Sequence, residues 1–374
     1  MSWQGLERLQ VEGYKSIRNA DIRFERLNVL IGANGSGKSN LIDLFRFMRR
    51  LAEGDLQATV GQAGGAESLL HYGRKNTDRL SIHLWFRRSA SLLNGYACTL
   101  LPTSGDSFVF EEERVFFQDT SRYEKPYDEW VGTAGHRETK LWEAASRSGV
   151  ARHVLEVMQS WQVYHFHDTS SSAKVKQTGD IEDNRALHAD AGNLAAYLYL
   201  LREKHPEHYR LIVETIRLAA PFFGDFVLRP SELNREKIRL EWRERGQDHI
   251  FGAHDLSDGT LRFICLAALL LQPPERMPQT VVLDEPELGL HPAAIATLAG
   301  MMRSASAYKQ IVVATQSVTL VNQFSPEEVI VVERGEDGAS IFRRVDSSGI
   351  ASWLEEYALG EVWEKNLIGG RPTP

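Results

Sequence analysis

Two groups of residues in this sequence have the types and spacing to bind and attack a phosphate group. The first is the segment GANGSGKS, which fits the pattern G-x-x-x-x-G-K-[ST]. Its glycines let backbone N–H groups turn toward phosphate oxygens, and the helix expected after it adds positive potential. Lys38 is expected to neutralise the outer phosphates, and Ser39 to ligate magnesium. The residues predicted to contact the nucleotide are Gly32, Ala33, Asn34, Gly35, Ser36, Gly37, Lys38, Ser39 and Asn40.

The second group is a pair of carboxylates in QTVVLDEPELGLHP, residues 279–292. An apolar run ends in Asp284 and Glu285, so both side chains are predicted at the C-terminal edge of a buried strand, where open α/β sheets bind ligands. Asp284 would hold magnesium, and Glu285 would polarise the attacking water. Asp-Glu-Pro alone is also a common strand-to-turn sequence. Its occurrence together with the phosphate loop favours the catalytic interpretation.

A third stretch, AHDLSDGTLRF, places Ser257 and Gly259 in a polar turn before a strongly apolar run. One interpretation is an N-cap, with Ser257 or Asp258 starting a core helix. The other is a second anion site, because a serine hydroxyl and a helix start offer donors and a dipole to a phosphate oxygen. The two interpretations are compatible.

Hydrophobic periodicity indicates the elements that position these residues. Residues 6–31 indicate two or three strands, of which LNVLI is buried, and apolar residues from Leu41 to Met48 follow one helix face. Alternating strands and helices then imply a parallel sheet covered on both sides. The later elements are expected as a meander over 80–118, a helix over 136–160, two helices broken near Pro206, a strand pair around 226–251, helices at 260–271 and 292–304, and strands at 280–284, 310–315, 328–333 and 339–345.

The composition narrows the classes of partner. A formal net charge of -7 gives no bulk attraction to nucleic acid or to an anionic membrane, so any DNA contact requires a local patch. Cys98 and Cys265 lie far apart, and the second falls in an apolar run that predicts a buried thiol. We find no signal-peptide pattern, and the apolar stretch 264–271 is too short to span a bilayer. These features predict a cytoplasmic protein without a membrane partner.

The order of GANGSGKS, LSDGT and VVLDEP resembles the ATP-binding cassette (ABC) ATPases, whose signature motif LSDGT matches. The opening VEGYKSIRNADIRFERLNVLIGANGSGKSNLIDLF and the turn DEPELGLHP look like the branch that includes the RecF, SMC and OLD families. Within that branch the chain resembles short, armless AAA-type ATPases of bacterial phage-defence and DNA-maintenance operons, to which the segments WQVYHFHDTSSSAKVK, NLAAYLYLLRE and LGEVWEKNLIGG add. The resemblance implies a P-loop NTPase of class α/β with an ABC-type head: a mixed sheet flanked by helices, an antiparallel β subdomain and a helical lobe. The cofactors implied are ATP and Mg2+.

By the same resemblance, Ser257 and Gly259 face an ATP held by a second chain, which implies a homodimer around two ATP molecules. Lys15 and Ser16, with Tyr14, would border the nucleotide near its base and α-phosphate, and His291 would lie at the dimer seam. The expected divisions are the N-terminal half of the head (1–130), a mainly helical insertion (131–250) and the C-terminal half of the head (251–374).

This sequence departs from the family pattern in three places. Gln316 stands where a switch histidine is expected; glutamine carries no proton but can orient a water or bond a γ-phosphate. Two residues, Gln62 and Gln118, are candidates for the glutamine of the Q-loop. After Gln316 there is no Asp-x-Asp pair of a TOPRIM nuclease, so any nuclease is expected to be a separate polypeptide.

A cluster of histidines and acids permits a metal interpretation. Strand alternation would place His165 and His167 on one face, with Asp168 next in the chain and His188 and Asp190 further on. The favoured interpretation is a turn that leaves a strand, because HDTSSS has the composition of an Asx turn. The arginines of RPSELNREKIRLEWRER are interleaved with acids and indicate a solvated strand pair.

The sequence as a whole predicts an ATPase that dimerises around Mg-ATP and controls DNA engagement or a partner effector, such as a nuclease encoded nearby. Assembly into oligomers larger than a dimer is left open. The alternatives are a slow or non-hydrolysing nucleotide-dependent scaffold and a RecF-like DNA-repair loader. A transporter subunit is disfavoured by the insertions over 90–250 and by the GLHP turn.

Overall fold

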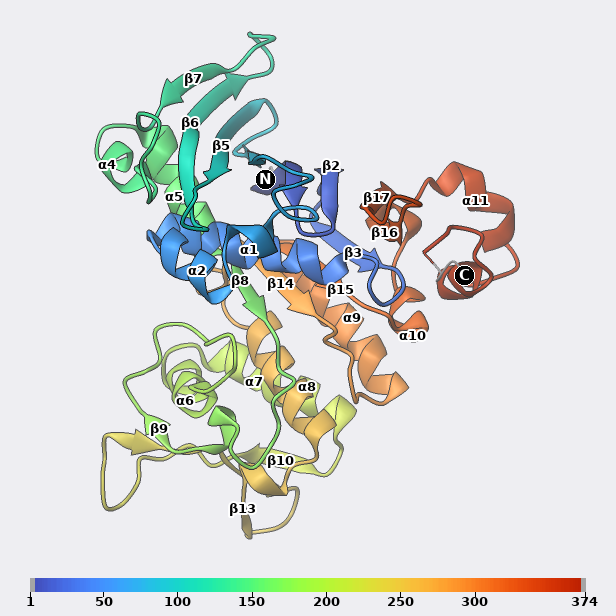
Figure 1. Ribbon diagram of the computed structural model, residues 1–374. Helices are drawn as coiled ribbons and strands as arrows, with labels where there is room; N and C mark the ends of the chain where they lie inside the picture. The colour runs from blue at the N-terminus through green and yellow to red at the C-terminus, as the bar shows by residue number, and fades with distance from the viewer. Residues whose placement is uncertain (1–3, 371–374) are drawn as a thin grey trace.

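Residues 4–370 are described by the structure, a computed structural model in which two six-stranded sheets lie side by side (Figure 1). The sheet that carries the candidate site has the strand order β17-β16-β3-β15-β14-β8. Its strands are parallel except β17, which is antiparallel to β16. The mixed α/β fold class is therefore confirmed. The strand bounds are β3 Leu27–Ile31, β8 Gln162–Tyr164, β14 Thr280–Asp284, β15 Gln310–Ala314, β16 Val329–Arg334 and β17 Ser340–Arg344.

The central strands of this sheet are apolar along their length because both of their faces are covered. Val29 and Val281 face one core, which they share with helices α6, α7, α8 and α9. Leu30 and Val282 face a second core, which contains α1 and α5. The expectation of a sheet covered on both sides is confirmed. The bounds of these helices are α1 Lys38–Glu53, α5 Gly149–Ser160, α6 Leu194–Lys204, α7 Pro206–Ala219, α8 Asp258–Leu270 and α9 Pro292–Ser306.

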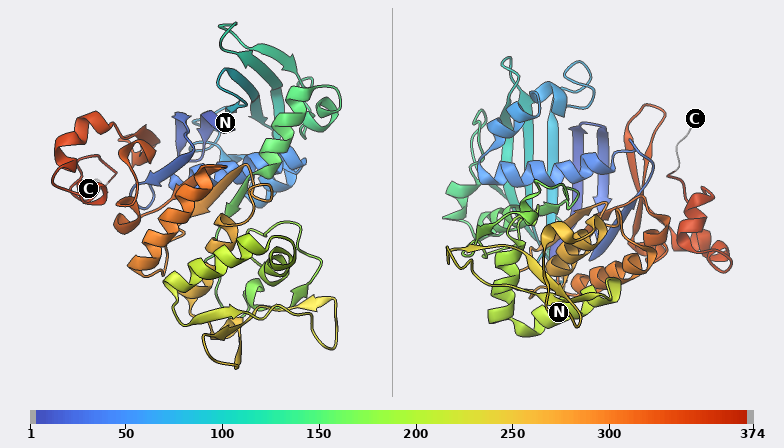
Figure 2. Two further views of the ribbon diagram at one scale, coloured as in Figure 1. Left: turned by 180° about the vertical axis from the view of Figure 1, so that it is seen from behind. Right: turned by 90° about the horizontal axis from the view of Figure 1, so that it is seen from below.

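The second sheet is antiparallel, with the order β2-β1-β4-β5-β6-β7. It packs against the side of α1 that faces away from the parallel sheet, and all three contribute to one core (Figure 2). Within that core the ring of Trp161 lies 4.9 Å from Phe45 and 5.9 Å from Phe86, which joins α1 to this sheet. The expected meander is thereby confirmed. The strand bounds are β1 Gly5–Tyr14, β2 Ile17–Arg23, β4 Leu80–Arg87, β5 Leu92–Pro102, β6 Phe108–Asp119 and β7 Tyr127–Trp130.

A helical lobe lies on the other side of the parallel sheet, at the bottom of Figure 1. It holds the two helices that Pro206 separates, as expected, with small sheets at its outer end. The expected strand pair around 226–251 is incomplete, because the chain forms three short strands there and a further two-residue pairing of β9 with β11, all too short to show a hydrophobic period. The bounds are β9 Gly179–Asp180, β10 Phe223–Phe226, β11 Lys237–Ile238, β12 Glu241–Glu244 and β13 Ile250–Gly252.

The helix expected over 136–160 begins later and is broken. Residues 136–140 form an irregular, non-helical segment because the buried carboxylate of Glu113 accepts hydrogen bonds from His136, Thr139 and the backbone N–H of Lys140. Ser148 then caps α5 as a separate helix. The other short helices are α2 Leu56–Gln62, α3 Ala66–Leu69, α4 Leu141–Ala145, α10 Val318–Val321, α11 Ser347–Leu354 and α12 Leu359–Glu364, of which α11 and α12 lie beside the edge of the parallel sheet (Figures 1 and 2).

Candidate active site

The predicted site residues follow the ends of neighbouring parallel strands. Asp284, the last residue of β14, pairs in register with Ala314 of β15, and Ala314 pairs with Leu30 of β3. The residues after these positions therefore emerge from the same edge of the sheet. The glycine-rich loop follows β3, Gln316 follows β15, and Glu285 follows β14. The sheet thus brings together three segments that are far apart in the sequence.

The glycine-rich loop runs from β3 into α1, as predicted. Gly32, Gly35 and Gly37 have φ angles of 153°, 77° and 114°, a region that disfavours other residues. A Cβ on Gly32 would lie 2.1 Å from the carbonyl oxygen of Val332, so the loop packs tightly against β16. Asn34, Gly35 and Ser39 are exposed, whereas Ser36, Gly37 and Lys38 are buried. The loop is therefore anchored on the sheet and open to solvent on its outer side.

The start of α1 has the properties of an anion site. This helix begins at Lys38 without a side-chain cap and without an acidic residue in its first turn, so its first N–H groups keep their donor capacity. The hydroxyl of Ser36 is buried and has no hydrogen-bond partner among residues 4–370. Lys38 Nζ donates to the carbonyl oxygens of Gly32 at 2.5 Å and Ala33 at 3.0 Å. A phosphate group fits this set of donors.

The charge of Lys38 is balanced by the acids at the same sheet edge. Burial lowers the pKa of Lys38, and the negative charges of Glu285, Asp284 and Glu287 act in the opposite direction. Gln316 donates a hydrogen bond from Nε2 to Oε1 of Glu285. The φ angle of Glu285 is 44°, a strained value for this residue type that turns the chain sharply after β14. The predicted lysine, acids and glutamine thus lie together.

Ser16 also reaches the loop, whereas Lys15 and Tyr14 have other contacts. The hydroxyl of Ser16 accepts a hydrogen bond from Asn40 at 2.6 Å and lies 2.6 Å from the hydroxyl of Ser340. Lys15 pairs with Asp43 of α1 at 2.9 Å, and the ring of Tyr14 is buried in the core. Asn40 and Ser16 therefore bond each other beside the phosphate loop.

Ser340 is a contact of the loop that the sequence did not indicate. Its hydroxyl donates to the carbonyl oxygen of Ser36 at 2.7 Å, and a Cβ on Gly37 would lie 2.0 Å from it. No motif marked Ser340, because it is more than three hundred residues from the loop and reaches it only through the pairing of β17 with β16.

Ser257 and Gly259 lie at the start of α8. The hydroxyl of Ser257 accepts from the N–H of Thr260 at 3.2 Å, so the N-cap interpretation is correct. A Cβ on Gly259 would lie 2.4 Å from the carbonyl oxygen of Gly289, which gives this glycine a packing role as well. His291 similarly caps α9, by accepting from the N–H of Ala293 at 3.3 Å. Ser257 and His291 are both exposed.

His165 and His167 lie beside the acids, a position that the sequence did not predict. His165 Nδ1 is 3.6 Å from Oδ2 of Asp284, the two imidazole centroids are 3.6 Å apart, and His167 Nε2 is 3.4 Å from the carbonyl oxygen of Glu285. The pairing of β8 with β14 places them there. Burial lowers the pKa of His167.

The less favoured interpretation of the histidines and acids, a metal site, has no support in the geometry. Within residues 4–370, no group of three or more metal-ligating side chains converges on one point. Asp168 forms an Asx turn with Ser170, as favoured from the sequence. His188 pairs with Asp183 at 3.1 Å, and Asp190 pairs with Lys174 at 2.9 Å.

The two glutamines considered for the Q-loop lie in other settings. Gln118 donates to the carbonyl oxygens of Tyr123 and Glu124 and so closes the turn between β6 and β7. Gln62 is exposed at the end of α2. The side chain next to Asp284 is instead His165, the residue that directly follows the adjacent strand β8.

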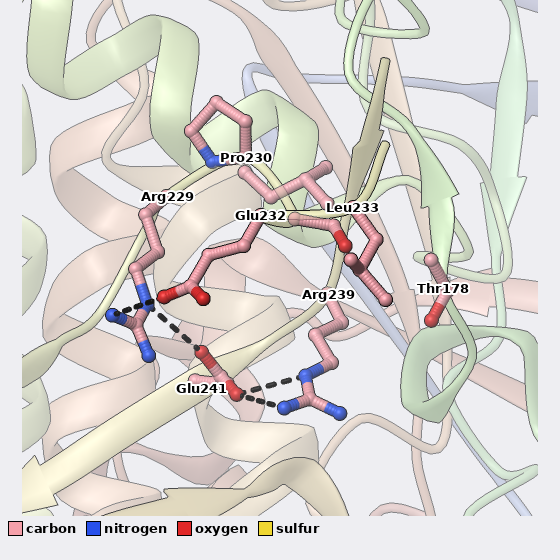
Figure 3. Close-up of a pocket in the computed structure, with 9 residues that line it drawn as sticks. Thr178, Arg229, Pro230, Glu232, Leu233, Arg239 and Glu241 are labelled. Carbon is pink, nitrogen blue, oxygen red and sulfur yellow. Dashed lines mark hydrogen bonds and ion pairs between the residues drawn. The ribbon is translucent and has the colours of Figure 1, made fainter. Parts of the chain in front are cut away.

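A separate cavity of about 350 Å³ lies in the helical lobe (Figure 3). Two arginines point into it, but both bond the same carboxylate: Arg239 Nε lies 2.8 Å and Arg229 Nε 3.8 Å from the oxygens of Glu241. Arg229 also pairs with Glu232 at 3.9 Å. The arginines are thus compensated by carboxylates within the chain. This agrees with the prediction of a solvated, charge-interleaved segment.

Glu287 is a third acid of the site, and no sequence motif marks it. It is buried, and the hydroxyl of Thr315 donates to its Oε1 at 2.5 Å. Its Oε2 has no partner among the described residues. Burial raises the pKa of Glu287, to which the charge of Glu285 also contributes. The one feature of the sequence that points to Glu287 is its position two residues after Glu285, in the same turn.

One family model matches residues 27–92 and 146–322, with the description "AAA domain, putative AbiEii toxin, Type IV TA system". The matched segments contain the phosphate loop, Ser257, the acid pair Asp284 and Glu285, and Gln316. A stretch of 128 residues is 29% identical to "Structural maintenance of chromosomes protein 1" of Schizosaccharomyces pombe. That match covers 30% of this chain and only 10% of the relative.

Solved structures of SMC heads share the fold. An SMC head bound to the C-terminal winged-helix domain of ScpA has a TM-score of 0.59 at 16% identity, over 90% of this chain and 96% of that one. The SMC head of Pyrococcus furiosus with an extended coiled coil, bound to the C-terminal domain of ScpA, has a TM-score of 0.56 at 16% identity, over 94% and 99%. The expected ABC-type head is thereby confirmed. Among residues 4–370 no helix is both long and apolar enough to cross a membrane.

The raised pKa of Glu287 predicts a pH-dependent effect of Glu287→Gln. A carboxyl group whose pKa is higher in the folded state contributes its full stability below the unfolded pKa, near 4.3, and loses it as the pH rises through the folded value. Because glutamine stays neutral and can still accept from Thr315, Glu287→Gln should melt at a higher temperature than the wild type at pH 8. The two proteins should differ less at pH 4.5. Thermal unfolding at both pH values measures this.

The exposed Glu356 of the C-terminal segment provides the control. Glu356→Gln should follow the wild type at both pH values. A Glu287→Gln protein that is less stable than the wild type at pH 8 would show that ionised Glu287 stabilises the fold.

Proposed function

The chain belongs to the family described as "AAA domain, putative AbiEii toxin, Type IV TA system". We propose that it is an ATPase that binds Mg-ATP, hydrolyses it and dimerises around it. The observation that carries the proposal is the convergence of Lys38 with Asp284, Glu285 and Gln316 at one sheet edge. An uncapped helix start and a buried cation bind phosphates, and carboxylates beside them serve magnesium and water. A purely structural turn has no need of this set.

Magnesium fits the oxygen donors available here. Ser39 is an exposed hydroxyl in the first turn of α1, and Asp284 is a carboxylate at the end of β14 with a side chain that is 16% exposed. We infer that these two residues hold the ion, because hydroxyl and carboxylate oxygens suit it. When bound, it would neutralise charge that develops on the phosphate oxygens.

Glu285 is the proposed general base. Its carboxylate would take the proton of the attacking water while Lys38 holds the outer phosphates. The amide of Gln316 already donates to Glu285 Oε1 and so fixes the direction of the carboxylate. The same hydrogen bond also favours the second candidate function, a slow or non-hydrolysing scaffold, because an oxygen that accepts from Gln316 is a weaker base. The steady-state turnover of the wild type distinguishes the two.

The dimer is proposed from the exposed start of α8. Ser257 and Gly259 would receive the γ-phosphate of an ATP held by a second copy of the chain, in addition to their cap and packing roles. The effector is proposed to be a separate protein, such as a nuclease, or DNA, in a phage-defence or DNA-maintenance system. Two of the solved SMC heads that share this fold are bound to domains of ScpA, which supports the idea of protein partners. DNA-stimulated turnover would instead favour a RecF-like loader.

Replacement of Glu285 by glutamine should separate binding from turnover. Glutamine keeps the size of the side chain but removes the base, so kcat should fall by about 100-fold or more. ATP affinity should stay within about 3-fold of the wild type, and the dimer should accumulate with Mg-ATP. Nucleotide titration, phosphate release and light scattering with and without Mg-ATP measure these quantities.

Lys38→Ala is the matched variant that should lose binding itself, because the phosphates lose their nearest fixed cation. Glu356→Gln should behave as the wild type. A Glu285→Gln protein that stays monomeric at saturating ATP would contradict the shared-site dimer.

A mixture of Lys38→Ala and Ser257→Arg chains tests composite sites. In a mixed dimer one site carries both lesions and the other carries neither, so two inactive proteins should together recover up to about half of the wild-type activity per mixed dimer. Ser257→Arg also removes the N-cap of α8, which costs about 1 kcal/mol. Ser257→Ala removes the cap without adding bulk and is the control for that loss. Full hydrolysis by Ser257→Arg alone would show that this turn serves only as a cap.

A further inference from the structure

Arg262 joins three segments of the chain around the acids. It lies on α8, five positions after Ser257, and is partly buried. Its guanidinium donates to three backbone carbonyl oxygens: Nε to Phe166, Nη2 to His167 and Nη1 to Leu288, each at 3.1 Å. A planar guanidinium has donors that point in several directions, which a lysine ammonium on a single atom does not reproduce.

The three acceptors lie on both sides of the acid pair. Phe166 and His167 follow β8, which runs beside β14, and His167 Nε2 lies 3.4 Å from the carbonyl oxygen of Glu285. Leu288 belongs to the turn after the acids, and its N–H donates to the same carbonyl oxygen at 3.2 Å. Arg262 therefore joins the segment after β8 and the turn after Glu285 to α8, the helix that Ser257 caps.

The packing between these segments leaves little room for independent movement. The gap lined by Arg262, His167, Asp284 and Glu285 has a volume of about 10 Å³, no more than one water molecule. A Cβ on Gly259 would lie 2.4 Å from Gly289, and one on Gly289 would lie 2.7 Å from Nη1 of Arg262. A shift of the start of α8 must therefore displace the turn that follows the acids.

We propose that Arg262 is a positioning residue that couples the signature turn, Ser257–Gly259, to the acids of the same chain, and so links the two ATP sites of the dimer. This coupling rests on the proposed function. In that dimer the signature turn contacts the ATP of the second chain, whereas Asp284 and Glu285 act on the ATP of their own chain. Arg262 transmits the position of α8 to Glu285 through backbone carbonyls, without touching nucleotide. Binding at one site thereby aligns the base at the other.

Arg262→Ala tests the coupling in the full chain. The variant should bind ATP within about 3-fold of the wild type, because the phosphate loop is intact. Its kcat should fall by about 10- to 100-fold, since small displacements of a catalytic group have effects of this size. The Hill coefficient of hydrolysis should exceed 1 in the wild type and should fall to 1 in Arg262→Ala. Millimolar guanidinium should restore part of the activity of Arg262→Ala, and Arg262→Lys should be only partly active.

Arg202→Ala is the matched control. Arg202 also joins a helix, α6, to a loop through one carbonyl oxygen, that of Leu228 at 2.8 Å, but in the helical lobe. This variant should keep the wild-type kcat and Hill coefficient, and thermal midpoints of all variants report folding. If Arg262→Ala does not fold, Arg262→Lys takes its place with the same expected split between kcat and ATP affinity.

A folded Arg262 variant with the wild-type kcat and Hill coefficient overturns the coupling. So does a loss of ATP affinity as large as the loss of kcat, or an equal loss in Arg202→Ala, since either result indicates a general structural effect. Turnover in the wild type that does not exceed that of Glu285→Gln overturns the proposed ATPase, and the coupling with it. If the wild type hydrolyses ATP and Arg262→Ala keeps the same turnover, the coupling alone is overturned and the proposed ATPase stands.

Discussion

The parallel pairing of β3, β15 and β14 is the constraint on which the rest of the structure depends. Backbone hydrogen bonds place Leu30, Ala314 and Asp284 in one row across the sheet, so the loops that follow must emerge together. The strand order differs from the sequence order, and this sets the neighbours. Gln316 leaves the sheet between the phosphate loop and the acids, and the histidines after β8 lie on the far side of the acids.

Close backbone contacts then hold these loops in place. Gly32 and Gly37 allow the phosphate loop to rest on β16 and against Ser340, while Gly259 allows α8 to approach the turn after the acids. A side chain at any of these positions would separate segments that have to touch. Small residues in the motifs therefore serve the packing of the chain as well as any ligand, and the two demands select the same residue type.

Charge at the site is balanced over a short range, and two of the charged groups, Lys38 and Glu287, are buried. Lys38 faces three acids, of which Glu287 is buried and bonded to Thr315. Burial shifts the pKa of Lys38 downward and that of Glu287 upward, so each is less disposed to ionise than it would be in water. A phosphate and a divalent cation would add opposite charges to the same region. The site is thus organised for ligands that bring compensating charge with them.

Much of the local structure could be predicted from the sequence because it depends on short-range patterns. The buried runs LNVLI and TVVLD, the glycine spacing of the loop, the cap at Ser257 and the proline that starts α7 each carry their own signal. The misplaced start of the helix at 136–160 has a long-range cause, the buried carboxylate of Glu113. Helix propensity gives no indication that residues 136–140 bond to Glu113, which lies in the distant strand β6.

The sequence by itself determined the residue types of the site: a lysine and a serine after tight glycines, and a carboxylate pair after a buried strand. Only the tertiary structure decided which other side chains join them. Ser340, His165 and Arg262 reach the site through strand order and helix packing, since β17, β8 and α8 are remote in the chain and adjacent in space. Contacts of this kind arise from the closing of long loops around two shared cores, which no local spacing records.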